Sequence, residues 1–365
     1  MIPFINLKSL HQQHADEINQ AVQRVIDSGY FILGPEGTAF EEAFASYHGV
    51  KYAVGVANGT DAIEIALWTA GVGRGDEVIT VSHTAMPTVT AIEAIGAVPI
   101  LVDIDPSTFT IDPKAIEAAI TPRTKAIIPV HIYGQSADMT AIMAIANQHN
   151  LLVVEDCAQG HGAKHKGQLV GTFGHLATFS FYPTKNLGAY GDGGAVITND
   201  DAYADRMKRI RFYGQSSRYT YTERGTNSRL DEMQAAILSV KLKYLDEHNA
   251  RRRVLAKNYD TCLSQLDIEL PSEHPDNHHV YHLYVIRTDN RDQVMSNLKE
   301  HGVGTIIHYP VPIHLQASHQ DLNMPQGSLP ITEQFAGEIL SLPLYIGLSE
   351  AQVEQVAHAL EQSLC

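Results

Sequence analysis

Apolar residues in the first 200 positions form short runs separated by segments of helical periodicity. The runs predict seven strands, at residues 52–57, 77–81, 98–102, 126–132, 151–155, 177–181 and 195–198. Helical stretches such as residues 60–70 and 139–149 separate most of them. Strands joined by crossovers of this length become parallel neighbours, and helices then cover both faces of the sheet. The pattern therefore predicts an α/β fold with a mostly parallel, seven-stranded sheet.

The last two predicted strands lack a helix between them. The segment that joins them is rich in Gly and Tyr and contains Pro183 and Lys185. A connection of this composition is more typical of a functional loop or a local hairpin than of a packed crossover.

The C-terminal third predicts a smaller α/β domain. A helical pattern runs from Ser228 to Tyr244, and charged residues become frequent after it, so we place a domain boundary near residue 248. This division gives a large domain, 1–247, and a small one, 248–365. The small domain is expected to contain a strand at 280–286 and helices at 292–301 and 349–363, the last opened by a capping box of Ser349 and Gln352.

Charge and composition exclude several classes of protein. The 365 residues carry 26 basic and 41 acidic side chains, a formal net charge of −15, which disfavours binding to nucleic acid or anionic lipid. Hydrophobic residues make up 44% and charged residues 18% of the chain, as in globular proteins. No apolar run is long enough for a membrane helix, and the N-terminus lacks a secretory signal, so a cytoplasmic protein is expected.

The cysteines predict neither a disulfide framework nor a zinc site. Cys157, Cys262 and Cys365 are far apart in the sequence, and no C-x-x-C pair occurs. We expect reduced, structural thiols.

Asp156 and Lys185 are the strongest candidates for chemistry. Asp156 ends a buried apolar strand, at the edge of an open α/β sheet where ligands bind. Lys185 follows 29 residues later in the glycine-flanked loop. Each residue alone has an ordinary alternative, a cap or a surface cation. Together they are the two groups that pyridoxal phosphate (PLP) chemistry demands, a lysine that forms an imine with the cofactor and a carboxylate that keeps its ring nitrogen protonated.

A phosphate site is predicted where Asn58-Gly59-Thr60 follows a strand and opens a helix. Gly59 lets the backbone approach an anion, and the free N–H groups and the Thr60 hydroxyl can bind it. An ordinary turn and helix cap is the alternative.

A further segment, residues 225–236, combines a polar turn with a strong helix start. With it the chain resembles the DegT/DnrJ/EryC1/StrS family of nucleotide-sugar aminotransferases, a branch of the fold-type I PLP-dependent enzymes. The resemblance covers nearly the whole chain. The matching segments, in family order, are Gly34-Pro35-Glu36 with Phe40-Glu41, Asn58-Gly59-Thr60, Glu155-Asp156-Cys157-Ala158-Gln159, Ser180-Phe181 with Lys185, Gly191-Asp192-Gly193-Gly194, Gly225-x-Asn227-x-Arg229, Glu232-x-Gln234-Ala235-Ala236 and Tyr309-Pro310-x-Pro312-x-His314.

The resemblance implies roles for these residues. Lys185 would bind the cofactor covalently, and Asp156 would pair with its ring nitrogen. Gln159 would lie beside the phenolic oxygen. The expected phosphate ligands are Gly59, Thr60, Ser180 and, from a neighbouring subunit, Asn227. The family expectation is therefore a homodimer with a shared active site.

One position departs from the family pattern. Many relatives carry an aromatic residue where Ala85 stands, and that residue stacks on the cofactor ring. His83 is our candidate for covering the ring, and a buried, hydrogen-bonded histidine is the alternative.

The resemblance also implies substrates. The amino donor would be L-glutamate. Residues 212–219 and 227–232 resemble the subgroup that aminates C3 of dTDP-3-keto-6-deoxyhexoses. In that subgroup Tyr182, His308 and Tyr309 would contact the hexose, although both tyrosines could simply pack in the core.

Several alternatives stay open. The substrate could be a UDP-linked keto-sugar aminated at C3 or C4, or the protein could be a non-catalytic regulatory or partner-binding member of this fold. Lys185 and Asp156 together argue against the second alternative. Lys185 alone argues against the family's dehydratases, which carry His there. No metal site is expected: His278 and His282 have the i, i+4 spacing of a helix, but residues 280–286 are predicted as a strand, in which residues at this spacing lie too far apart for one ion.

Overall fold

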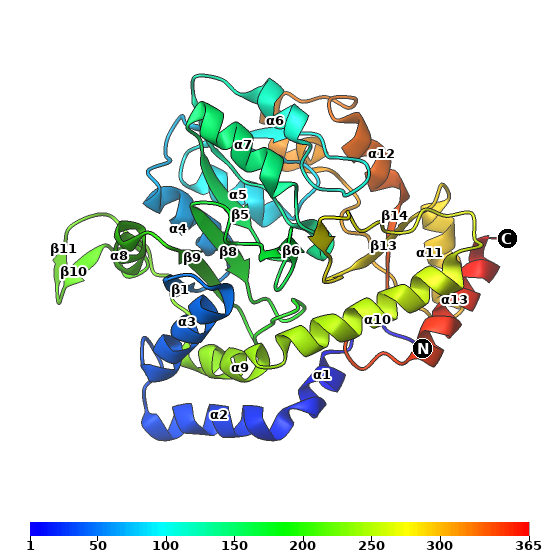
Figure 1. The fold of residues 1–365 in the computed structure, drawn as a ribbon, viewed down its shortest axis with the longest axis horizontal. Helices are drawn as coiled ribbons and strands as arrows, with labels where there is room; N and C mark the ends of the chain where they lie inside the picture. Colours follow the sequence, from blue (N-terminus) through cyan, green and yellow to red (C-terminus); the bar gives the residue numbers. More distant parts are fainter. Residues whose placement is uncertain (365) are drawn as a thin grey trace.

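The computed structural model describes residues 1–364, and a seven-stranded sheet lies at its centre (Figure 1). The strand order is β1-β9-β8-β5-β4-β2-β3; β9 is antiparallel to both neighbours and the other pairs are parallel. The predicted α/β fold with a mostly parallel sheet is confirmed. The strands are β1 (Tyr52–Val56), β2 (Glu77–Val81), β3 (Val98–Val102), β4 (Thr124–Ile127), β5 (Leu152–Asp156), β8 (Leu176–Ser180) and β9 (Gly194–Thr198).

Helices cover both faces of this sheet, as the apolar strand patterns predict. Successive strand residues contribute to opposite cores, so that Val78 packs with the helices of one face and Ile79 with those of the other. One face is covered by α4 (Gly59–Thr69), α5 (Met86–Ala94) and α8 (Asp201–Ile210). The other is covered by α3 (Pro35–His48), α6 (Pro113–Ala119), α7 (Met139–His149) and α9 (Glu232–Leu242).

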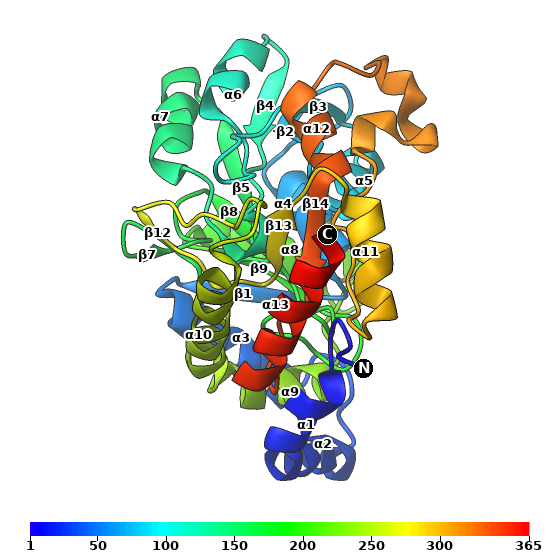
Figure 2. The same ribbon diagram turned by 90° about the vertical axis from the view of Figure 1, so that its right-hand side faces the viewer.

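The C-terminal part packs around a two-stranded antiparallel sheet, β13 (Tyr284–Arg287) with β14 (Ile339–Leu342). Its core joins α10 (Leu245–Leu263), α11 (Arg291–Glu300) and α13 (Glu350–Leu364), and it includes Ile2 from the N-terminus, which lies beside these helices (Figure 2). Residue 248 lies inside the continuous helix α10, so the division at that point stays a prediction.

The remaining elements are short or peripheral. They are α1 (Leu7–Gln13), α2 (Ala15–Ser28), α12 (Pro330–Glu338), β6 (Lys164–His165), β7 (Gln168–Leu169), β10 (Gln215–Ser217), β11 (Thr220–Tyr221), β12 (Asn277–His278) and the 3₁₀ turns η1 (Ile132–Gly134), η2 (Ile313–Leu315) and η3 (Ala317–Leu322). Within residues 1–364, no helix combines the length and apolar character needed to cross a membrane.

Three predicted elements are longer than those observed. The strand expected at 126–132 ends at Ile127, close to Pro129, which has no N–H to donate. Pairing continues only as an isolated bridge between Val130 and Asp156, and the chain then turns at η1, where Tyr133 has a left-handed φ of +59°. The strand expected from residue 280 begins at Tyr284, because Val280 N–H and Leu283 N–H instead bond to carbonyls of that turn, at 2.9 and 3.2 Å.

The helix expected from Ser228 begins only at Glu232, because the preceding residues pair with other segments. Ser228 N–H, for example, donates to Arg211 O at 3.0 Å. By contrast, the capping box is confirmed: Gln352 N–H donates to Ser349 Oγ at 3.2 Å, and Ser349 N–H donates to Gln352 Oε1 at 3.0 Å.

Candidate active site

A cavity of about 230 Å³ lies at the carboxyl ends of β5 and β8. Seven residues that the sequence singles out line it together: Gly59, Thr60, Asp156, Gln159, Ser180, Tyr182 and Lys185. The rest of the lining is Asn58, Ile63, Thr84, Ala85, Pro87, Thr88, Val130, Ala158 and Asp192. The cavity thus lies where open α/β sheets bind their ligands.

Asp156 is the last residue of β5 and is buried. Its Oδ2 accepts a hydrogen bond from Thr88 Oγ1 at 2.9 Å, and its Oδ1 accepts one from Ala158 N–H at 3.1 Å. These bonds orient the carboxylate at the cavity wall. Thr88 was missed by the sequence analysis, since a threonine in the first turn of a helix carries no signal of its own.

Lys185 lies in the connection between antiparallel strands β8 and β9, so this connection is not a packed crossover, as the sequence predicted. Its burial lowers the pKa of Lys185 to about 8, while the charge of Asp156 acts in the opposite direction. Helix α9 holds the rest of this loop: Gln234 Oε1 accepts from Tyr190 N–H at 2.8 Å, and Lys241 Nζ donates to Gly188 O.

The N-terminus of α4 lies at the cavity, packed closely against Ser180. Asn58 Oδ1 caps the helix by accepting from Asp61 N–H at 2.8 Å, and Gly59 begins it. A Cβ on Gly59 would lie 2.6 Å from Ser180 Cβ, so only glycine fits there. Backbone N–H groups at a helix start beside two hydroxyl side chains suit a phosphate.

Gln159 bridges the cavity and the Tyr309 turn. Its Oε1 accepts from Tyr133 N–H at 2.7 Å, and its Nε2 donates to Tyr309 Oη at 3.3 Å. Burial raises the pKa of Tyr309 to about 12, so its phenol is neutral at physiological pH.

Two of the three expected substrate residues, His308 and Tyr309, are not among the lining residues of the cavity. The Tyr309 hydroxyl accepts a hydrogen bond from Gln159, which does line the cavity, whereas His308 Nδ1 bonds to Ser341 Oγ at 2.9 Å. Burial, with the Lys185 charge nearby, lowers the pKa of His308 to about 4, so its ring is neutral. The substrate roles of both residues stay predictions.

His83 does not line the cavity either. It is buried, and its Nε2 bonds to Tyr133 Oη at 2.7 Å; burial lowers its pKa to about 4. This is the buried, hydrogen-bonded histidine that the sequence left as the alternative. Ala85 lines the cavity in place of an aromatic side chain, and ring stacking by His83 stays a prediction.

Asn227 is exposed and lies outside the cavity, after the hairpin β10–β11 that projects from the body of the molecule (Figure 1). Aromatic and aliphatic side chains of the hairpin region and of the α2–α3 connection, which bridges to Asp231, are exposed. They are Tyr30, Phe31, Ile32, Leu33, Tyr213, Tyr219 and Tyr221, each with 43–77% of its surface accessible.

The described residues contain one cluster with metal-ligand chemistry, His131, Glu155 and Cys157, and hydrogen bonds already occupy it. Glu155 accepts from the N–H groups of Gly171, Phe173 and Gly174 at 2.7–2.8 Å and from His131 Nε2 at 3.1 Å. His131 Nδ1 accepts from Ala137 N–H, which places the ring proton on Nε2. The cluster therefore anchors the 171–174 turn.

The histidine pair considered for metal binding is also explained. His278 lies in β12, and His282 is buried and bonds through Nδ1 to Asn186 Oδ1 at 3.0 Å. Cys157 is buried, and burial raises the pKa of its thiol; Cys262 is free, and Cys365 lies outside the described residues.

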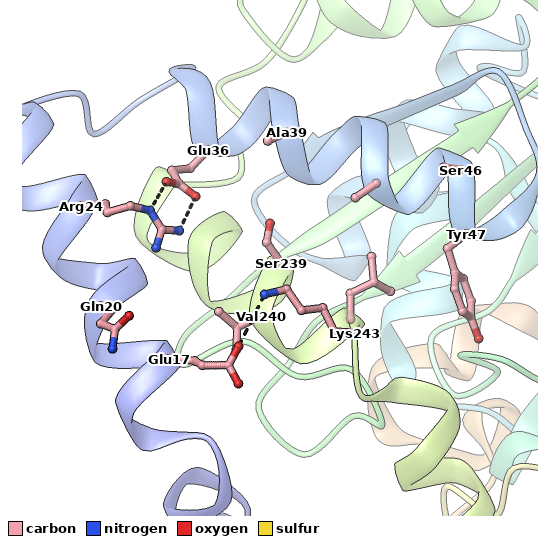
Figure 3. Close-up of a pocket in the computed structure, with 12 residues that line it drawn as sticks. Glu17, Gln20, Arg24, Glu36, Ala39, Ser46, Tyr47, Ser239, Val240 and Lys243 are labelled. Carbon is pink, nitrogen blue, oxygen red and sulfur yellow. Dashed lines mark hydrogen bonds and ion pairs between the residues drawn. The ribbon is translucent and has the colours of Figure 1, made fainter.

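A larger groove of about 710 Å³ runs between α2, α3 and α9 (Figure 3). Two ion pairs lie along it, Arg24 with Glu36 at 3.0 Å and Lys243 with Glu17 at 3.4 Å. It shares no lining residue with the cavity around Lys185. The groove is larger than the cavity around Lys185 but contains none of the residues that the sequence predicts for the active site.

The residues of the smaller cavity fit PLP. A partly buried lysine with a lowered pKa can form the covalent bond, Asp156 can pair with the ring nitrogen, and the α4 start can take the phosphate. Fold and site together define a fold-type I PLP-dependent enzyme.

Comparison with known proteins agrees. Residues 12–361 match the DegT/DnrJ/EryC1/StrS aminotransferase family. The chain is 46% identical over 362 residues to dTDP-3-amino-3,4,6-trideoxy-alpha-D-glucose transaminase of Streptomyces venezuelae, covering 99% of this chain and 96% of the relative. It is 45% identical over 360 residues to UDP-2-acetamido-2-deoxy-3-oxo-D-glucuronate aminotransferase of Pseudomonas aeruginosa, covering 99% of each.

Two solved structures show the same similarity in three dimensions. The crystal structure of DesV from S. venezuelae superposes with a TM-score of 0.97 at 46% identity, covering 99% of this chain and 98% of that one. NtdA from Bacillus subtilis, with bound cofactor PMP, the amine form of PLP, gives 0.92 at 36% identity, covering 100% and 85%. The chain therefore belongs to the DegT/DnrJ/EryC1/StrS aminotransferase family and is a PLP-dependent aminotransferase.

Proposed function

We propose that this aminotransferase acts on nucleotide-linked sugars and moves an amino group from L-glutamate to the keto group of a dTDP-linked 3-keto-6-deoxyhexose. The observation that carries the proposal is the single cavity that combines Lys185, Asp156 and the cradle at Gly59. The nucleotide-sugar transaminases among the relatives support the substrate class.

Lys185 is the residue that we assign to covalent binding and proton transfer. PLP supplies, when bound, an electron-poor ring that stabilises negative charge at the carbon that loses its proton. Lys185 Nζ takes the proton from Cα of the amino donor and later returns one to the aminated sugar carbon. A pKa of about 8 leaves part of the lysine uncharged near neutral pH, as a base requires.

Asp156 is the residue that we assign to the ring nitrogen. Its carboxylate can hold a proton on that nitrogen, while Thr88 and Ala158 N–H orient its oxygens. Gln159 is assigned to the phenolic oxygen, and Thr60 and Ser180 to the phosphate. Replacing Asp156 by Ala should cost orders of magnitude in rate.

Tyr182 is our candidate for the sugar, together with His308 and Tyr309. The Tyr182 side chain lines the cavity and is 53% exposed, so it can meet a substrate that enters from solvent. A UDP-linked keto-sugar is the second candidate substrate, favoured by the P. aeruginosa relative. Parallel assays with dTDP- and UDP-linked 3-keto-sugars separate the two candidates.

The visible spectrum of the PLP-loaded protein tests the reaction. We expect a long-wavelength band from the lysine-bound cofactor that excess L-glutamate abolishes, and that Lys185→Ala cannot form. A wild-type band that glutamate leaves unchanged would refute the glutamate-dependent assignment.

The active site is, in our proposal, shared between two subunits of a homodimer. Support comes from Asn227, which is exposed outside its own cavity, and from the exposed apolar side chains near it. Mixing inactive Lys185→Ala and Asn227→Ala subunits tests this arrangement. If each site takes its lysine from one subunit and its asparagine from the other, one site of every hybrid dimer is intact, and about a quarter of wild-type activity should return. If both residues came from one subunit, no site would be intact in a hybrid and no activity would return.

A further inference from the structure

A buried series of side-chain hydrogen bonds links the loop that carries Lys185 to the loop that follows Asp156. It begins at Asn186, the residue after Lys185, which is 6% exposed. Asn186 Nδ2 donates to Asn249 Oδ1 at 2.8 Å and to Val280 O at 3.2 Å, and its Oδ1 bonds to His282 Nδ1 at 3.0 Å. Three separate segments of the chain therefore meet at this amide.

Asn249, on helix α10, extends this series of hydrogen bonds to the loop that contains His161. It is buried, and its Nδ2 donates to His161 O at 2.8 Å. His161 lies five residues after Asp156, on the loop that follows β5. A Cβ on Gly162, whose φ is +85°, would lie 2.6 Å from Asn249 Nδ2, so the loop approaches α10 this closely only because residue 162 is glycine.

The backbone carbonyls at the two ends of this series determine which group donates in each hydrogen bond. Backbone carbonyls can only accept, so His161 O and Val280 O fix the amide groups of Asn249 and Asn186 as donors. Asn249 Oδ1 must then accept from Asn186, and Asn186 Oδ1 must accept from His282. His282 keeps its proton on Nδ1 and stays neutral, since burial and the Lys185 charge lower its pKa.

The lysine loop needs such support, because residues 181–193 contain neither helix nor strand. A PLP ring is rigid, so the lysine that binds it and the carboxylate that pairs with its nitrogen must keep a fixed separation. A misplacement of about 1 Å at such a site can cost about 100-fold in rate.

We propose that Asn186 and Asn249 are positioning residues that hold Lys185 at a fixed place relative to Asp156. The proposal rests on the roles assigned above to those two residues. His282 is the third member of the chain and orients the Asn186 amide.

The test compares Asn186→Ala, Asn249→Ala and the double variant with wild type and with Tyr259→Phe. Tyr259 is buried and its hydroxyl donates to Pro343 O at 2.8 Å, so its variant removes a buried hydrogen bond of the C-terminal part without touching either loop. The measurements are the pH midpoint for PLP capture by the apo-protein, the spectrum of the lysine-bound cofactor, kcat and KM, and Tm.

Each asparagine variant should still trap PLP on Lys185 as a borohydride-stable adduct. The pH midpoint should shift and kcat should fall about 10- to 100-fold, with KM for glutamate within about threefold of wild type. The kcat of the double variant should be no lower than that of the less active single variant, because both substitutions break the same series of hydrogen bonds. Tyr259→Phe should lower Tm and leave the midpoint, the spectrum and kcat unchanged.

Two results would overturn the proposal: asparagine variants whose midpoint and kcat change no more than those of Tyr259→Phe, or single effects that add in the double variant. If the alanine variants do not fold, Asn249→Leu nearly keeps the volume and adds no charge near Lys185 but removes the bonds to Asn186 and His161, and the same shifts are expected. A wild-type protein that traps no PLP on Lys185 would instead refute the proposed catalytic role of that lysine.

Discussion

Gly59→Ala should weaken PLP binding far more than it weakens the fold. The new Cβ would lie 2.6 Å from Ser180 Cβ, whereas ordinary contact begins at 3.4 Å, so the start of α4 must move by about 0.8 Å. A charge-assisted N–H to phosphate bond of about 2.8 Å would then exceed hydrogen-bonding distance.

The magnitude follows from the value of one such bond. Losing a hydrogen bond to a charged group costs about 1.5–3 kcal/mol. That loss corresponds to an increase of about 10- to 150-fold in the Kd for PLP. The fold itself should lose little, because alanine is better than glycine in a helix by about 1 kcal/mol, which offsets part of the crowding.

Titration of the apo-protein with PLP, followed by absorbance and paired with Tm, measures both effects. Gly73→Ala is the matched control, because a Cβ there meets nothing within 4 Å. Ser180→Gly combined with Gly59→Ala removes the clashing Cβ and should recover part of the affinity beyond the effect of Ser180→Gly alone. A Gly59→Ala protein that binds PLP within twofold of wild type would refute the assignment of this helix start to the phosphate.

Three further predictions concern other parts of the chain. The rate of PLP capture by the apo-protein should rise with pH around a midpoint of about 8, because the reactive form of Lys185 is the uncharged amine. In Asp156→Asn this midpoint should fall below that of wild type, because the wild-type carboxylate favours the charged ammonium form of Lys185. An unchanged midpoint would contradict the coupling of the two residues. Glu155→Gln should lower the free energy of unfolding, measured in urea, by about 3–5 kcal/mol, because the new amide NH₂ would face backbone N–H donors. A loss below about 1 kcal/mol would show that the four hydrogen bonds accepted by Glu155 are not maintained in solution. Ser349→Ala should cost about 1 kcal/mol through the lost helix cap, with Ser264→Ala, at an exposed helix end, as the comparison.

The local pattern of the sequence was enough to locate the strands and the chemistry at their ends. Periodicity identified all seven strands of the central sheet, and the position of Asp156 at a strand end indicated the binding edge. The prediction that Gly59 lies at the start of a helix is confirmed, and the residue lines the same cavity. These features could be predicted because each depends on neighbours within a few residues.

Contacts between distant segments were decided only by the tertiary structure. Thr88 meets Asp156 across 68 residues, and Asn249 meets His161 across 88, and neither pairing leaves a pattern in the sequence. The same holds for the element ends that differ from prediction, such as the late start of β13, where the turn around Tyr133 takes the N–H groups of the expected strand. Local propensity describes how a segment can fold alone, whereas burial and hydrogen bonding across the chain decide where it stops and which residues meet in the active site.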